Sequence, residues 1–226
     1  ALPRMAGLLL HEDEAVQQCA VQAVANLGVD ATDAPSFLSS GWHLALISLL
    51  SAATEETQAA AAAVLGNLSA AADFRLAIVA DGALQPILQL LHAPGLASST
   101  AAVRALAIMS QQLMSADVPP DDPASTDFVS ALFDAAALPQ LLSVLAAAGA
   151  PPPTGAPPPT EDASAAMGER RLVAALLLLQ NLSGGHGQVR PRLVQGGAIS
   201  ALVSFLAVRT NGANGANGGG GGGGGG

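Results

Sequence analysis

The sequence contains no lysine and no tyrosine, and it has a single cysteine and a single tryptophan. Without lysine the chain has no side chain for a Schiff base and no P-loop lysine for nucleotide phosphates. Its one cysteine, Cys19, cannot form a disulfide within the chain. These absences exclude several common kinds of catalytic and cofactor site, so we expect no enzymatic activity, no cofactor and no bound metal.

The 8 basic residues are all arginine and stand against 17 acidic residues, which gives a formal net charge of −9. An acidic chain without lysine offers no basic stripe to neutralise phosphate groups, so we expect no binding to nucleic acid. The longest wholly apolar run, residues 172–179, is much shorter than the roughly 20 residues needed to cross a bilayer. No membrane insertion is therefore expected.

Alanine and leucine dominate what is present, with 49 and 34 of the 226 residues. Both are strong helix formers, whereas the aromatic residues, which favour strands, make up only 3% of the chain. The composition therefore predicts an all-α protein.

A repeat with a period of 41 residues organises this composition. Asn26 and Asn67 are 41 positions apart and each is followed by leucine and a small residue, as is Asn181. Gly41 and Gly82, each at the expected start of a helix, are also 41 positions apart. A period near 40 in a helical sequence is typical of units that stack into a solenoid.

Within each unit, apolar residues recur at helical spacing. One column of equivalent positions is always alanine, at Ala20, Ala61, Ala102 and Ala175. A second column consists of Val24, Leu65, Leu106 and Leu179, and a third of Leu27, Leu68, Met109 and Leu182. We expect the alanine column to let neighbouring helices approach closely and the two larger columns to form the core.

Two insertions and a tail depart from this pattern within a solenoid that we place at residues 1–209. The insertions lie near residues 115–127 and 148–166, between expected helices. The proline-rich stretch 151–159 favours a stiff exposed spacer over a ligand for an SH3 or WW domain. The Asn- and Gly-rich residues 210–226 bury nothing to offset their backbone entropy, so we predict a disordered tail. Because the pattern starts and stops inside a unit, we expect a fragment of a longer protein.

The repeated pattern is a glycine, replaced by Ala136 in the fourth unit, that opens an apolar helix, followed by a short turn and a long helix that ends in a motif such as Asn-Leu-Ser. This pattern, which recurs in register, resembles the armadillo repeat. The resemblance implies a right-handed α-solenoid of about four units plus a partial fifth. It also implies a scaffold that binds a protein or an extended peptide along its concave face, with no small-molecule substrate. We expect an intracellular location, either cytoplasmic or nuclear.

In several armadillo proteins the asparagine of the third helix binds the main chain of an extended peptide. The positions that match this motif here are Asn26, Asn67 and Asn181. An amide suits the task because it offers a donor and an acceptor to a peptide backbone. Ile108 interrupts the series in the third unit. The alternative is that these asparagines cap or bridge their own repeats.

Nuclear import receptors of this family carry tryptophan four residues before that asparagine. The matching positions here are Gln22, Ala63, Arg104 and Leu177. We therefore do not expect a receptor for nuclear localisation signals, and the lack of lysine argues against a basic trough for acidic partners of the catenin-like kind. A second hypothesis is the substrate-recruiting armadillo region of a larger U-box-type ubiquitin ligase.

Other chemically active residues have structural interpretations. The four histidines stand at different repeat positions, which favours surface or loop histidines over metal ligands. They are His11, His43, His92 and His186. We expect Cys19 to be a small packed thiol and Trp42 to pack at a repeat junction. The acidic stretches 12–14 and 55–56 fit helix caps better than a binding patch.

Overall fold

The computed structural model describes residues 7–93, 95–111, 123–134, 137–149, 162–184, 189–204 and 207. The regular elements among these residues are helices, and none of the described residues lies in a β-strand. The all-α prediction is therefore confirmed.

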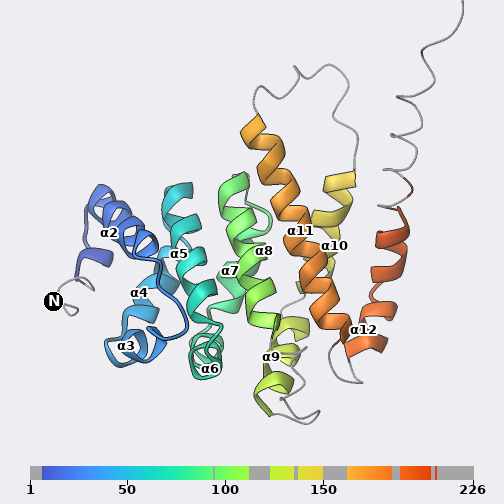
Figure 1. The fold of residues 1–226 in the computed structure, drawn as a ribbon, viewed down its shortest axis with the longest axis horizontal. Coiled ribbons are helices and arrows are strands. Elements are labelled where there is room, and N and C mark those ends of the chain that lie inside the picture. The colour runs from blue at the N-terminus through green and yellow to red at the C-terminus, as the bar shows by residue number, and fades with distance from the viewer. Residues whose placement is uncertain are drawn as a thin grey trace, which may run out of the picture.

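The helices follow one another in a cycle of three types (Figure 1). First helices are α3 (Ala34–Ser39), α6 (Ala72–Ala80), α9 (Pro123–Asp134) and α12 (Val189–Gln195). Second helices are α4 (Trp42–Leu49), α7 (Leu84–Leu90), α10 (Ala137–Gly149) and a helical stretch at residues 198–204. Third helices are α2 (Glu14–Asn26), α5 (Glu55–Leu68), α8 (Leu96–Ser110) and α11 (Asp162–Gly184).

The third helices form one layer of the molecule. In this layer α5 packs between α2 and α8, and α8 packs between α5 and α11 (Figure 1). The helices α5, α8 and α11 also contact the second helices of their own units, and α6 contacts the first helices α3 and α9 on either side. The core therefore lies beneath the third helices, and the units stack into the predicted α-solenoid.

The glycine that opens the second helix is required by the backbone. Gly41, Gly82 and Gly197 have φ angles of 72°, 83° and 86°. These values lie in the left-handed region, which residues with a side chain rarely adopt. The repeated glycine therefore marks a tight turn between the first and second helices.

The alanine column is buried in all four third helices, as predicted. Ala20 is 7% exposed, and its equivalents Ala61, Ala102 and Ala175 are fully buried. Close approach of the helices extends to Gly66 on α5. A Cβ atom added to Gly66 would lie 2.8 Å from Cα of Ala105 on α8, so a larger residue would push the two helices apart.

The two columns of larger residues form the core, with one exception. Val24, Leu65 and Leu106 are at most 1% exposed, and so are Leu68, Met109 and Leu182. Leu27, which was expected in the same column as Leu68, is instead 72% exposed. The prediction is wrong here because α2 is the first of the described third helices and has such a neighbour, α5, on one side only.

Apolar residues are also exposed at the other end of the layer. One of them, Ile199, lines a cavity of about 510 Å³ between α11, α12 and the stretch 198–204. Ile199 and Val203 are 55% and 60% exposed. Their equivalents Leu84 and Leu88 on α7 are buried, because α7 packs on the third helix α8. No described third helix covers the stretch 198–204 in the same way.

Most of the two insertions predicted near 115–127 and 148–166 lies outside the described residues. The proline-rich stretch 151–159 and the tail 210–226 lie there as well. Where the insertions are described, helices reach into them, since α9 begins at Pro123 and α11 at Asp162. As a result α11 is 23 residues long, compared with 14 for α5.

Candidate functional site

The third helices present two rows of residues on the side away from the core. We call these rows the third-helix face. One row consists of Gln22, Ala63, Arg104 and Leu177, and the other of Asn26, Asn67, Ile108 and Asn181. Every member is exposed or half-buried, although each lies within one turn of a fully buried residue. The two rows are four residues apart, which places both on one side of each helix.

Asn26 lies at the end of α2 and is exposed. Its side-chain oxygen accepts a hydrogen bond from Nε2 of Gln22, one turn earlier, at 3.3 Å. The interaction stays within one helix and at the surface. Asn26 is therefore accessible to a partner on the third-helix face.

Asn67 is half-buried near the end of α5 and interacts with the next unit. Its Oδ1 accepts a hydrogen bond from Nη2 of Arg104 on α8 at 3.2 Å. The amide nitrogen of Asn67 has no acceptor among the described residues. The bond thus links two adjacent third helices and leaves the Asn67 side chain with a donor to offer.

Asn181 is half-buried on α11 and holds the neighbouring unit. Its Nδ2 donates to the carbonyl oxygen of Ala107 and to Oγ of Ser110 on α8, both at 3.0 Å. These contacts agree with the alternative that the asparagine bridges its own repeats. The amide nitrogen that would donate to a peptide carbonyl is already used at this position.

The three asparagines therefore lie on the same face, but their side chains have different hydrogen-bond partners. They form no hydrogen bond with one another among the described residues, and the half-buried Ile108 stands between Asn67 and Asn181. Asn26 stays within its helix, Asn67 is held by an arginine, and Asn181 ties α11 to α8.

The third-helix face also contains groups that the asparagine motif did not predict. Arg104 is exposed, and the aliphatic side chains of Val173 and Leu177 on α11 are 50% and 46% exposed. Val173 and Leu177 precede Asn181 by eight and four residues, and this helical spacing is the signal that could have identified them. Sequence reasoning used Arg104 and Leu177 only to show that the tryptophan of the import receptors is absent.

The acidic residues at the helix starts include two caps, as predicted. Oδ1 of Asp13 accepts a hydrogen bond from the backbone N–H of Ala15 at 2.9 Å at the start of α2. Oε1 of Glu55 accepts from the backbone N–H groups of Ala97 and Ser98 at 2.6 and 3.2 Å. Glu55 thus caps α8, the third helix of the following unit, rather than its own helix.

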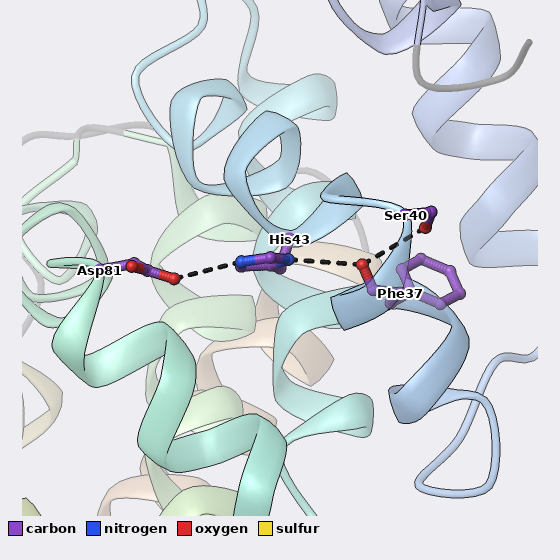
Figure 2. A network of polar contacts seen from close by, with 4 residues as sticks. All are labelled: Phe37, Ser40, His43 and Asp81. Atoms are coloured by element: carbon purple, nitrogen blue, oxygen red, sulfur yellow. Dashed lines mark hydrogen bonds and ion pairs between the residues drawn. The ribbon is translucent and has the colours of Figure 1, made fainter. Parts of the chain in front are cut away.

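His43 is not the surface or loop histidine that was expected, because it is 9% exposed inside α4. Figure 2 shows its ring between Phe37 and Asp81. Nδ1 lies 3.3 Å from the carbonyl oxygen of Phe37, which also accepts from Oγ of Ser40. Nε2 lies 3.1 Å from Oδ2 of Asp81, at the end of α6. The histidine therefore connects two units, and its burial follows from a partner that the periodicity does not reveal.

Cys19 and Trp42 were both expected to be packed, and only Trp42 is. Cys19 is exposed, so the expectation of a packed thiol is wrong. The equivalent Ala60 on α5 is buried, because α5 has third helices on both sides and α2 has one. Trp42 is 2% exposed and packs edge-on against Phe37, with ring centroids 4.9 Å apart, which confirms its packing role.

The described part of the chain contains no group of three or more His, Cys, Asp or Glu side chains that could hold a metal ion. His186 lies outside the described residues. Within the same limits, none of the helices combines the length and the apolar character needed to span a bilayer.

Comparisons with known proteins extend the fold assignment. No protein-family model and no curated protein sequence matches the chain. Among solved structures, a designed armadillo repeat protein in complex with the peptide (KR)4 superposes with a TM-score of 0.71 at 21% identity, over 93% of this chain and 78% of that one. A computationally designed armadillo repeat protein for modular peptide recognition gives 0.69 at 22% identity, over 91% and 74%.

A third structure, described only as an engineered protein, gives a TM-score of 0.69 at 22% identity over 91% of this chain and 71% of that one. All three similarities extend over nearly the whole chain, so the agreement concerns the stacking of the units and not one helix pair. The chain therefore has the fold of an armadillo repeat solenoid.

Proposed function

We propose that this chain is a non-enzymatic scaffold that binds an extended polypeptide along the third-helix face. The observation that carries the proposal is Asn67, whose oxygen is held by Arg104 while its amide nitrogen has no acceptor among the described residues. A fixed amide donor on an exposed face suits a peptide carbonyl. A designed armadillo repeat protein with the same fold forms a complex with the peptide (KR)4, which supports peptide binding by a scaffold of this kind.

The spacing of the third helices suits an extended chain. Packed helices lie roughly 8–10 Å apart, and an extended chain advances about 3.3 Å per residue. Neighbouring third helices would therefore meet main-chain groups about three residues apart. Asn26 and Asn67 are both accessible for such contacts, whereas Asn181 contributes chiefly to the packing of α11 on α8.

The test starts with a display library of random dodecapeptides, from which binders of the purified chain are selected. Calorimetric titration of a selected peptide should give about three- to tenfold weaker binding to Asn67→Ala, the loss expected for one neutral hydrogen bond. The matched control is Gln85→Ala, which removes an exposed amide from α7 outside the third-helix face. It should leave affinity unchanged.

Equal affinity of Asn67→Ala and the unaltered chain for the selected peptides would contradict the proposal, as would failure to select any peptide. Unchanged circular dichroism of both variants shows that the fold is intact. The U-box alternative rests on the resemblance alone, and no structural observation favours it.

A further inference from the structure

The third-helix face differs between its two halves. On α5 the exposed row carries Ala63, and the position one turn earlier is Ala59. On α11 the equivalents are Leu177 and Val173, which are about half exposed. Large aliphatic side chains left in water on a surface patch mark a contact site more often than isolated ones do.

Arginine accompanies these aliphatic side chains. Arg104 on α8 is exposed, and its hydrogen bond to Asn67 holds the guanidinium over the junction of α5 and α8. Among the described residues, no carboxylate oxygen lies within 4 Å of this guanidinium group. The ion pair that these residues form joins His43 and Asp81 instead. The arginine is therefore positioned but not neutralised by a described acidic group.

A second arginine, Arg170, lies on the same side of α11 as Val173 and Leu177. Arg170 is exposed and precedes Val173 by three residues and Leu177 by seven, which places all three on one helix face. The equivalent position on α5 is Glu56, so the sign of the charge changes between the two halves of the face.

We propose that the segment bound over α8 and α11 carries an acidic side chain and an aliphatic side chain two or three residues apart, a specificity that rests on the proposed function. The carboxylate pairs with Arg104, and the aliphatic group covers Leu177 and Val173. A guanidinium with several unused donors binds a carboxylate through charge-assisted hydrogen bonds. The separation follows from helices roughly 8–10 Å apart and about 3.3 Å per extended residue.

The net charge of −9 does not oppose this partner locally. Exposed charges act over about 8 Å at physiological ionic strength, so distant acidic residues are largely screened. The local arginines decide which side chain fits. The absence of lysine argues against acidic partners for the chain as a whole. On this part of the third-helix face, however, Arg104 and Arg170 supply positive charge.

Three synthetic dodecapeptides test the proposal by fluorescence anisotropy with the full chain. They are four repeats of Asp-Ser-Leu, four repeats of Arg-Ser-Leu and four repeats of Asp-Ser-Ser. The first should bind at least about tenfold more tightly than either of the others, because only it supplies both a carboxylate and an aliphatic group. Its affinity should fall as sodium chloride is added.

Two variants locate the site. Arg104→Gln should weaken binding of the Asp-Ser-Leu peptide about tenfold, in line with the loss of one hydrogen bond to a charged group. Leu177→Ser should weaken it as well while leaving the salt dependence unchanged. The matched control, Arg192→Gln, removes an exposed arginine from α12, outside the third-helix face, and should have no effect.

The outcomes separate this inference from the function on which it rests. If library-selected peptides bind in an Asn67-dependent way but the Arg-Ser-Leu peptide binds as tightly as the Asp-Ser-Leu peptide, the acidic-aliphatic specificity is wrong and the scaffold function stands. If Arg104→Gln does not change the affinity for the Asp-Ser-Leu peptide, the acidic-aliphatic specificity is likewise wrong and the scaffold function stands. If no peptide binds at all, the proposed function itself fails.

Discussion

The carboxylate of Glu55 accepts a hydrogen bond from the backbone N–H of Ala97 at 2.6 Å, one repeat further along the chain. It thereby satisfies a donor at the start of α8, where the first N–H groups of a helix have no partner within the helix. Gly95 makes room for this contact, because a Cβ atom there would overlap the Glu55 carboxyl group. The cap therefore holds two units together as well as one helix end.

Glu55→Ala should lower the free energy of unfolding by about 1 kcal/mol, the usual effect of removing a side-chain cap. The reason is that the N–H groups of Ala97 and Ser98 lose their acceptor at a partly buried site. Urea unfolding followed by circular dichroism at 222 nm, a wavelength that reports helix content, gives the change in midpoint.

Glu56→Ala is the control for this prediction. Glu56 follows Glu55 in the sequence and carries the same charge, but it is exposed and makes no hydrogen bond to a described residue. Its removal should change the free energy of unfolding by less than about 0.5 kcal/mol. Equal effects of the two variants would mean that charge near the helix start, and not the cap on α8, stabilises the fold.

Gly82→Ala should destabilise the protein by about 1–2 kcal/mol, the cost of forcing a residue with a side chain into the left-handed region. The φ of Gly82 is 83°, and a Cβ atom added there meets nothing within 4 Å. The effect is therefore one of backbone strain and not of packing. Gly82→Asn should cost less, because asparagine tolerates this region better. Thermal unfolding that ranks asparagine below alanine would contradict the argument.

The fold was predictable because its constraints repeat. A buried alanine at the same place in every third helix, and a left-handed glycine before α4, α7 and the stretch 198–204, are local requirements that recur from unit to unit. Local requirements leave a periodic trace in one sequence. The period of 41 residues was sufficient to identify the second and third helices and most of the core.

The candidate site was less predictable because its contacts join different units. Asn181 donates a hydrogen bond to Ala107, 74 residues earlier, and both insertions lie between them in the sequence. His43 is buried because Asp81 of the next unit reaches it, whereas Leu27 and Cys19 are exposed because α2 has a neighbouring third helix on one side only. Such pairings depend on how the units stack, which the spacing within a single unit does not specify.

The contact between His43 and Asp81 should couple the stabilities of two units. A carbonyl oxygen and a carboxylate oxygen face the two ring nitrogens (Figure 2). A double-mutant cycle of His43→Leu and Asp81→Ala should give a coupling energy of about 1 kcal/mol. The replacement by leucine suits the site, since Leu84 occupies the equivalent position in the next unit. Additive effects of the two substitutions would show that no coupling exists.

Leu65→Ala and Leu27→Ala should differ sharply although sequence periodicity assigns both leucines to the core. Leu65 is fully buried in α5 among neighbours on all sides, and truncation should cost about 2–5 kcal/mol through lost burial and the cavity left behind. Leu27 is 72% exposed, so its truncation should change the free energy of unfolding by less than about 0.5 kcal/mol. Urea unfolding of the two variants under the same conditions gives both values. A large loss for Leu27→Ala would mean that the C-terminal end of α2 is covered in solution by a contact absent from the described residues, and would reinstate the core position that the repeat predicts.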